Sequence, residues 1–564
     1  MKKFTAVTMA LVLTSCILIG CGESDADTPD VENQSPNVDV ADEDAVYTYD
    51  WGEYDALIDE IKTTTDFARR EELMHKAEDI LMETGVILPV YYYNDTYMQK
   101  DYVSNIYSSP FGFKFFMFSR TQGDTLRLSI SGEPDGLDPA LCSDVEGASF
   151  AVNSFAGLYT YGAEGGVIPD LAADEQVSED GLTYTVTLLP DLKWSNGSEL
   201  NADDFVYAWN RAADENTAAK YAYMFDIIDR NDDGTLKVEA SDDAQVLTIR
   251  LKAPCAYFNE LLAVPAYFPV KKSEVERASD WETNPGAWAQ KVGFISNGAY
   301  TLAEWTHDES MTYIKNPYYH RADEVETTTL QFELSADDMA VYASYNAGDL
   351  DFIDSVPSDD IPDLLTNSEF NIADRPGIFY VSFNVNSPLF DGKTAAQAGA
   401  MRRAFALLVD RDYICTYVTR TGQKPANSYI PFGMADGNGG VFKTNDAGYT
   451  FPDGESVGYF DTHWSAAGVE EAIALLEFAG FKFENGMLSA ETPISLEYLV
   501  SDDPAYIAVA EALQQDFSEI GIDMTIKIAY GNEFMNERKS DNYDMTCNSL
   551  FADVNDPISM LEIN

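Results

Sequence analysis

The feature that most constrains the fold of this chain is an alternation of helical and strand-like patterns. The helical periods cover residues 66–82, 472–478 and 504–520, and the strand-like runs cover residues 86–93, 494–500 and 522–528. Helices that feed strands in this order are typical of α/β lobes with a substantially parallel sheet. The pattern therefore predicts an α/β fold.

Length and charge limit the possible partners. The 564 residues, of which 45% are hydrophobic, are enough for two or three packed lobes. The balance of 35 Lys+Arg against 96 Asp+Glu gives a net charge of -61. A surface this acidic repels phosphate backbones, so nucleic acid is excluded as a partner, and the acidic shell favours solubility.

The first residues have the pattern of a bacterial lipoprotein signal. Lys2 and Lys3 precede an apolar run over residues 4–19, which is too short for a stable membrane span. The run ends in Leu-Ile-Gly-Cys21, which resembles a lipobox, so we expect a signal peptide over residues 1–20 and acylation, for example by palmitate, of Cys21. Cys16 and a plain secretory signal are the alternatives.

An acidic tether follows the signal peptide. Residues 22–45 contain no Lys or Arg and are rich in Asp, Glu, Pro, Ser and Asn, which is the composition of a solvated linker. We therefore assign residues 21–45 to a disordered tether that begins at the lipid.

Four further cysteines stand far apart, with no CxxC motif. They are Cys142, Cys255, Cys415 and Cys547. Disulfides outside the cell are one interpretation, and scattered, free, buried cysteines are the favoured one. Their spacing does not define a pairing.

One segment carries a family resemblance. Residues 177–212, VSEDGLTYTVTLLPDLKWSNGSELNADDFVYAWNRA, resemble the signature of the extracellular solute-binding proteins of family 5, the oligopeptide- and dipeptide-binding proteins of ABC importers. Further motifs in family order are GEPDGLDPA at 132–140, NGAYTL at 297–302, GDLDF at 348–352 and FYVSFNVNSPLF followed by MRRAFALLVDRDYI over 379–414. The likeness extends from residue 125 to residue 564.

The resemblance implies a two-lobe periplasmic-binding-protein-like fold of type II, cluster C, with the ligand cleft between the lobes. It implies a substrate-binding lipoprotein that captures oligopeptides as a monomer and delivers them to the permease subunits of an ABC transporter. Neither catalytic residues, a cofactor nor a metal is implied. The protein would face the extracellular space or periplasm and contact the cell membrane through the lipid on Cys21 alone.

The order of the segments departs from the family pattern. The family's closing part, with a helix, a PVYYY-like strand and an aromatic segment, occurs here first, over residues 54–118. We therefore expect a circular permutation, in which residues 121–124 form a short turn between neighbouring strands at 111–117 and 126–130. A truncated tandem copy is the alternative.

The permutation predicts the lobe boundaries. Residues 94–379 would form lobe I, and residues 46–93 together with 380–564 would form lobe II. The two hinge crossings would lie near Tyr93 and Tyr380.

The resemblance places the ligand's α-ammonium group on Asp553, within FADVNDP at residues 551–557. Leu550 and Phe551, just before it, complete the peptide-binding segment. An unpaired ammonium in a closed cleft would be costly, which is why a fixed carboxylate is needed. The alternative is an ordinary aspartate that caps a turn.

On the lobe I side, the resemblance places a cleft loop at residues 142–147, with Ser143 and Asp144 at its centre. Tyr221 falls at the position of a ligand-facing tyrosine, and Tyr223 is the alternative core residue.

Two departures from the peptide binders bear on specificity. Leu550 stands where a tryptophan is common, and Cys547 stands where an arginine is frequent. These changes leave the general role intact and bear on the length and side-chain preference of the peptide. Separate alternatives are another family ligand, such as a nickel complex, an oligosaccharide or a signalling peptide, and a surface lipoprotein without a transport role.

Residues 229–240 resemble the start of a calcium-binding loop. The twelfth position is Ala240 instead of a carboxylate, so a hairpin turn is the favoured interpretation.

Overall fold

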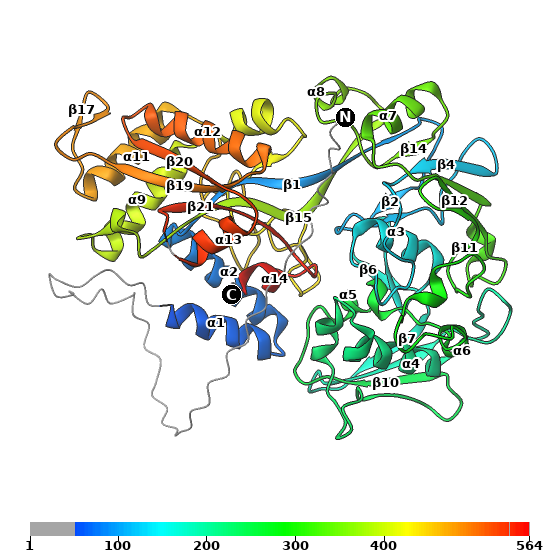
Figure 1. The fold of residues 1–564 in the computed structure, drawn as a ribbon. Helices are drawn as coiled ribbons and strands as arrows, with labels where there is room; N and C mark the ends of the chain where they lie inside the picture. The colour runs from blue at the N-terminus through cyan, green and yellow to red at the C-terminus, as the bar shows by residue number, and fades with distance from the viewer. Residues whose placement is uncertain (1–50, 541, 563–564) are drawn as a thin grey trace, which may run out of the picture. The chain divides into compact units, whose positions relative to one another are not determined.

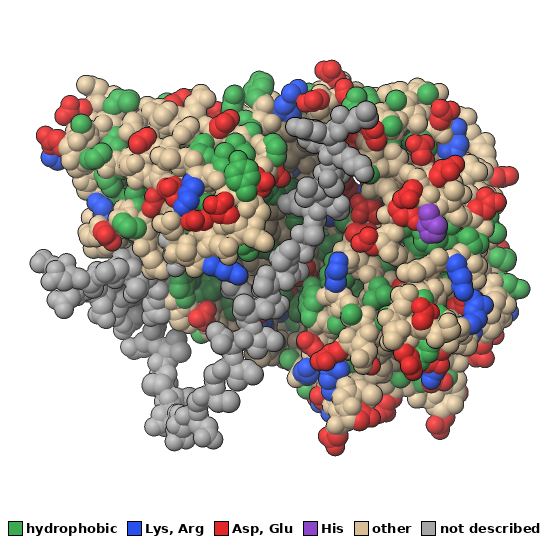
Figure 2. Space-filling view, viewed as in Figure 1, with side chains coloured by type: hydrophobic (Ala, Val, Ile, Leu, Met, Phe, Trp, Pro, Cys, Tyr) green, Lys and Arg blue, Asp and Glu red, His purple; other side chains and the backbone are tan. Residues whose placement is uncertain are grey.

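The computed structural model describes residues 51–540 and 542–562, and Figure 1 shows their fold. The predicted signal peptide, Cys21 and the tether lie outside these residues. Between residues 51 and 562, no described helix combines the length and apolar character needed to cross a bilayer. Acidic side chains occur throughout the described part of the face in Figure 2, without forming a single patch.

An 11-stranded mixed sheet runs through the described chain. Its strands in spatial order are β11 (Tyr300–Thr306), β12 (Ser310–Lys315), β13 (Thr329–Glu333), β4 (Thr125–Ser129), β14 (Phe352–Ile353), β1 (Ile87–Gln99), β15 (Phe370–Phe383), β21 (Met545–Phe551), β19 (Ser495–Ser501) and β20 (Asp523–Ala529), with β16 (Lys424–Pro425) paired to β1. A separate sheet has the order β7 (Ala172–Val177), β8 (Thr183–Leu188), β10 (Val246–Arg250) and β9 (Val238–Ala240).

The strand directions fit the prediction of a parallel sheet in part. β19 is parallel to both β20 and β21, and β4 is parallel to β13 and β14. β1 and β15 are instead long antiparallel partners, of 13 and 14 residues, and β15 is antiparallel to β21. In Figure 1 these two strands cross from one part of the molecule to the other.

The buried hydrophobic residues form separate clusters. We use lobe I for residues 94–379 and lobe II for residues 46–93 with 380–564, as predicted. The largest cluster draws on residues 103–352, with Val554 as its one member from outside that range. Two further clusters draw on residues 54–92 and 378–561, and a fourth, small one joins Met98 to residues 341–364.

Several elements form where the sequence predicts, although the helix predicted at 472–478 begins at Ala466 and the strand predicted at 86–93 extends to Gln99. α2 (Phe67–Thr84) starts at Asp66, whose side chain accepts a hydrogen bond from Arg69 N at 3.1 Å, and it ends at Gly85 with φ +64°. The other predicted helices are α11 (Ala466–Phe478) and α12 (Pro504–Ser518). The predicted strands are β1, β19 and β20.

The signature over residues 177–212 is a structural unit of lobe I. Gly197 takes a φ of +79° in the turn that follows Trp194. Asn201 and Asp204 form a capping box at the start of α4 (Ala202–Ala212), and Asp204 also accepts a hydrogen bond from Trp194 Nε1 at 3.1 Å. The motif therefore shapes the fold, through this turn and this helix start.

The GEPDGLDPA motif is tied to the same unit by a buried aspartate. Asp138 pairs with Arg211 of α4, and it accepts hydrogen bonds from Trp288 Nε1 at 2.7 Å and from Ala140 N at 3.1 Å. All of these partners belong to lobe I. The buried charge is thus compensated within one lobe.

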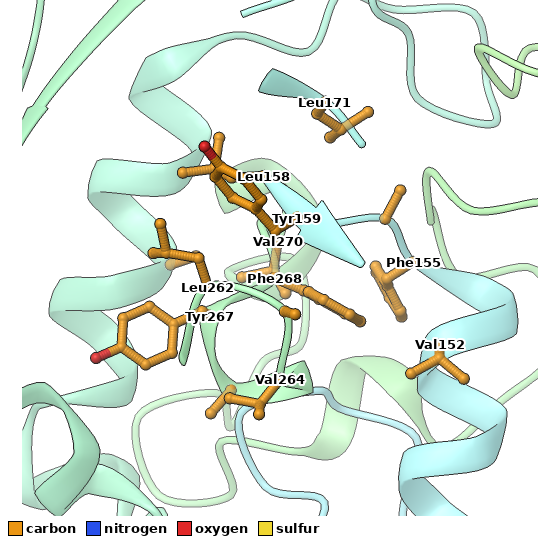
Figure 3. Packing of buried hydrophobic residues seen from close by; sticks show 14 of the residues in the cluster. Val152, Phe155, Leu158, Tyr159, Leu171, Leu262, Val264, Tyr267, Phe268 and Val270 are labelled. Atoms are coloured by element: carbon orange, nitrogen blue, oxygen red, sulfur yellow. The ribbon is translucent and has the colours of Figure 1, made fainter. Parts of the chain in front are cut away.

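The NGAYTL motif supports the core shown in Figure 3, where Phe155 follows α3 (Val145–Ser154). Asn297 accepts from Ala156 N at 3.1 Å and donates to Ala156 O at 2.9 Å. A Cβ on Gly298 would lie 2.4 Å from the backbone carbon of Ser154, so only glycine fits there.

The predicted strand pair at residues 121–124 is not formed. Residues 121–124 are an exposed connection, as expected, but the segment before them pairs as β3 (Lys114–Phe115) with β2 (Tyr107–Ser108) instead of with β4. The reason is that side chains of α3 take the place of a strand. Ser149 Oγ accepts from Lys114 N at 3.1 Å, and Asn153 Oδ1 accepts from Phe116 N at 2.8 Å.

Candidate functional site

One edge of β21 is open beside the predicted site. β21 pairs with β15 from Met545 to Phe551, but its other edge meets β19 only at Met545 and Thr546. Within the described residues, positions 548–551 therefore have no strand on that side. An open edge of this kind can hold an extended chain through main-chain hydrogen bonds, which tolerate different side chains.

Asp553 lies two residues beyond this edge. Its backbone N–H donates to Ser559 Oγ at 2.7 Å, which fixes the loop. Burial raises the pKa of its carboxyl group, and a hydrogen bond from Tyr223 partly opposes that rise. Asp553 forms no ion pair with any described residue, so a ligand cation is the natural partner for its charge.

Two tyrosines of lobe I lie opposite Asp553. Tyr221 precedes the 3-10 helix η2 (Ala222–Ile227), and the rings of Tyr221 and Tyr223 are 6.2 Å apart. Burial raises the pKa of Tyr221, and the charges of Asp553 and Asp144 raise it further. Tyr221 is therefore near both predicted acidic residues.

The alternative of Tyr223 as a core residue is wrong. Its side chain is 43% exposed and interacts with Asp553. In the tight turn of η2 it is Phe225 that enters the core, fully buried, which leaves Tyr223 free to face the aspartate.

The cleft loop over residues 142–147 is built as a helix start. Asp144 caps α3 and accepts a hydrogen bond from Gly147 N. Ser143 Oγ accepts from Lys220 Nζ at 2.8 Å, next to Tyr221. Burial raises the pKa of Asp144, and the charge of Lys220 opposes that rise. The loop thus places the polar side chains of Ser143 and Asp144 near Tyr221.

The side chains of Leu550 and Phe551 have different neighbours. Leu550 pairs with Ile378 and packs against the buried cluster of lobe II. The Phe551 ring lies 4.6 Å from the ring of Tyr93, and a Cβ on Gly377 would be 2.5 Å from it. The structure therefore groups Phe551, but not Leu550, with Tyr93, near which one hinge crossing is predicted.

A charged cluster beside Phe551 was not found from the sequence. The Arg375 guanidinium lies 5.8 Å from the Phe551 ring. Burial lowers the pKa of Arg375, and the charges of Asp95, Asp354 and Glu146 oppose this. These groups come from β1, β15, the end of β14 and α3, so no local pattern could reveal them.

Lys114 holds the same cluster together. Its side chain is buried and lies 2.5 Å from Asp95 Oδ2 and 2.8 Å from Asp354 Oδ1. Burial raises the pKa of Asp354 to about 7, although the charge of Lys114 lowers it. The cluster ties β3 and the end of β14 to β1.

Metal and disulfide chemistry find no support in the part of the chain that the structure describes. No group of three or more His, Cys, Asp or Glu side chains is placed there to hold a metal ion. In the segment predicted to be a hairpin, Arg230 bridges to Leu236 in an antiparallel turn. The four described cysteines are free and buried, as the favoured interpretation of their spacing predicts.

Comparison with known proteins decides the family. The model of the bacterial extracellular solute-binding proteins, family 5 (middle region), matches residues 166–564. The chain belongs to this family. It is therefore a transport binding protein and not an enzyme, and the family is extracellular.

Relatives of this solute-binding protein carry peptide-binding names. A dipeptide-binding protein, DppE, of Bacillus subtilis is 30% identical over 456 residues, which is 79% of this chain and 77% of the relative. The oligopeptide-binding protein OppA of the same species is 28% identical over 454 residues, or 78% and 77% of the two chains.

Solved structures confirm the two-lobe α/β fold of the family. The unliganded open form of the periplasmic murein tripeptide-binding protein MppA matches with a TM-score of 0.63 at 24% identity, over 78% of this chain and 81% of that chain. Listeria monocytogenes OppA bound to peptide matches with a TM-score of 0.51 at 24% identity, over 78% and 83%.

Proposed function

We propose that this protein is the substrate-binding lipoprotein of an ABC importer, and that it captures oligopeptides between its lobes for delivery to a membrane permease. The observation that carries the proposal is the open edge of β21, followed two residues later by Asp553, which has no ion-pair partner among the described residues. The edge suits a peptide main chain and the carboxylate suits its α-ammonium group. The names of the relatives support the same ligand class.

The lobe I residues complete the proposed site. Tyr221, Tyr223, Ser143 and Asp144 would close over the first residue of the peptide from the side opposite to Asp553. Phe551 would contact the following residues. The anchor at Cys21 rests on the sequence of the signal peptide and on nothing in the described residues.

Acetylation of the peptide amine tests the role of Asp553. Alanine peptides of two to six residues, with free and with N-acetylated amino groups, would be titrated into the protein by calorimetry. We expect binding of the free-amine peptides and a loss of at least tenfold in affinity on acetylation, because the acetyl group removes the charge. Absence of binding by every free-amine peptide would refute the proposed function.

Asp553→Asn separates the function from the assignment of the residue. The variant should bind free-amine peptides about as weakly as the wild type binds the acetylated ones. Asp391→Asn, a matched change at an exposed position of lobe II, should bind like the wild type. If Asp553→Asn keeps full affinity, another group holds the amine.

We also propose that the segment order is a circular permutation, with the lobe boundaries given above. The helix α14 (Ile558–Leu561) lies against α1 (Gly52–Thr63), where Tyr54 OH donates to Leu561 O. A chain in family order would run directly from one helix to the other.

A rearranged chain tests the permutation. It would start at residue 124, run to residue 562, continue through a short Gly/Ser linker to residue 52, and end at residue 123. We expect a cooperative melt and the same peptide affinity as the parent. Failure of this chain to fold, while the parent folds, would contradict the proposal.

A further inference from the structure

Residues 553–556, which begin two positions beyond the open edge, form a contact between the lobes, and we call them the clasp. Val554 is 8% exposed and packs in the lobe I core, whose other buried members all lie between Val103 and Phe352. Asp553, directly before it, faces the lobe I tyrosines. The clasp therefore extends from lobe II into lobe I.

The other half of the clasp is anchored in lobe II. Asp556 is 1% exposed and accepts two hydrogen bonds from Arg70 of α2, at 2.7 and 2.8 Å. Asn555 Oδ1 accepts from Ala435 N at 3.3 Å. The position of Asp553 thus depends on how the clasp sits on lobe I.

Glu260 lies beneath the clasp on the lobe I side. It belongs to the short helix α5 (Phe258–Leu261), and its Oε2 is buried without a hydrogen bond from any described residue. Tyr161 of β5 (Tyr159–Tyr161) and Asn555 of the clasp face its carboxyl group.

The charges around Glu260 do not compensate it. The nearby Asp556 is also acidic, and Arg70 is already committed to Asp556. Tyr257, just before α5, lies under the Arg70 guanidinium at 5.9 Å, and Asn259 Nδ2 of α5 donates to Glu175 at 3.3 Å. Burial raises the pKa of Glu260 to about 7, although Tyr161 and Asn555 favour its charged form.

We propose that Glu260 is a positioning residue that lets the clasp, and with it Asp553, close on lobe I when its carboxyl group is protonated, so that ligand affinity is linked to proton uptake. The inference rests on the proposed function. A neutral carboxyl group can donate as well as accept, and it can be buried under the clasp at little cost. An ionised one would be buried without a cation.

The sign of the linkage follows from the two states. With the lobes apart, Glu260 would contact water and have a pKa near its ordinary value of 4.5, whereas under the clasp it is about 7. The closed state therefore binds the proton more tightly. Closure weakens by up to tenfold per pH unit as the pH rises from about 4.5 to about 7, and it changes no further above that.

Glu260→Gln tests the inference, because glutamine keeps the shape and is always neutral. The tightest-binding alanine peptide would be titrated into both proteins between pH 5.5 and 7.5. Because the wild type should lose up to tenfold per pH unit between about 4.5 and about 7, we expect the affinity of the variant relative to the wild type to rise about twentyfold from pH 5.5 to pH 7.5. Titration of Asp553 and of the peptide amine affects both proteins alike, so it cancels in the ratio.

Glu239→Gln is the matched control, since Glu239 is exposed on β9 of the same lobe. It should follow the wild-type pH profile. A wild-type to Glu260→Gln ratio that does not change with pH would overturn the role of Glu260, while leaving the proposed function intact. Failure of the wild type to bind any alanine peptide would instead refute the proposed function.

Amide hydrogen exchange tests the clasp without a ligand. Exchange in residues 552–562, corrected for the intrinsic effect of pH, should become faster in the wild type between pH 5.5 and 7.5 and stay constant in Glu260→Gln. Parallel changes in both proteins would overturn the inference. If Glu260→Gln does not fold, Asn555→Ala replaces it, and it should lose affinity at pH 5.5 and flatten the profile.

Discussion

Two buried aspartate–arginine pairs in this protein have the same chemistry and different surroundings. Asp138 and Arg211 lie in lobe I, where Trp288 and the backbone of residue 140 complete the hydrogen bonding. Asp556 and Arg70 lie at the clasp, next to Tyr257 and Glu260 of the other lobe. The first pair has all its partners in one lobe, and the second has neighbours in two.

The difference separates contacts within one lobe, which we call the frame, from contacts between the two lobes, which we call the joint. Groups whose partners all belong to one lobe keep them when the lobes move, so the Asp138 pair can only stabilise the fold. Groups at the clasp change their surroundings when the lobes move, so their protonation and hydrogen bonding can depend on the ligand.

Asp138→Asn should cost the most. It leaves the buried Arg211 charge without a counter-charge, and removal of one member of a buried pair typically costs about 3–5 kcal/mol. Urea unfolding followed by circular dichroism would measure the loss. Asp174→Asn, at an exposed position of the same lobe, should be neutral. A stable Asp138→Asn with unchanged unfolding would show that the frame does not depend on this pair.

Arg70→Met should destabilise less and also weaken ligand binding. The change leaves the Asp556 charge uncompensated and should lower the free energy of unfolding by about 3 kcal/mol, the lower end for buried pairs. Because the clasp carries Asp553, the affinity for free-amine peptides should fall as well, measured by calorimetry under conditions where the variant is folded. Loss of stability with full affinity would mean that the clasp belongs to the frame.

Gly298→Ala should destabilise lobe I without affecting the site. Its Cβ would overlap the backbone at Ser154, which cannot move aside as a side chain could, and overpacking typically costs about 1–3 kcal/mol. Gly136→Ala is the control, because nothing lies within 4 Å of its Cβ. Equal melting temperatures for the two variants would contradict the tight approach of these segments.

Lys62→Met should have the smallest effect. Lys62 pairs with Glu562 and connects α1 to α14, but the two side chains are 41% and 43% exposed. Exposed pairs contribute about 0–1 kcal/mol, and salt screens them. We expect a change in the free energy of unfolding that vanishes in high salt. A large, salt-independent loss would place this contact among the buried ones.

The sequence predicts the frame better than the joint for a physical reason. The elements of the frame follow from local sequence patterns, each a few residues long: a cap at Asn201, a turn at Gly197 and a helical period in α2. Asp553 could be assigned through the family motif. Val554 and Glu260 could not, because their roles arise from contacts between residues almost 300 positions apart.

Tertiary contacts also explain where the sequence predictions were wrong. The alternation over residues 111–117 has the period of a strand, but side chains of α3 satisfy its backbone. Tyr223 lies in an apolar context, yet the tight turn of η2 exposes it. In both cases a short sequence pattern is compatible with two local structures, and contacts with the rest of the fold decide which one forms.

The ribbon formed by β1 and β15 has a mechanical consequence. Their pairing shifts register twice, between Pro89 and Tyr91 and between Tyr92 and Asn94, and such irregularities bend and twist a ribbon locally. We expect the ribbon to bend most easily along the line where its pairing is irregular. Tyr93 lies on it, with the Phe551 ring against its own. Phe551 therefore lies close to the line along which the ribbon bends. A given displacement of Phe551 would turn the ribbon through a larger angle than the same displacement farther from this line.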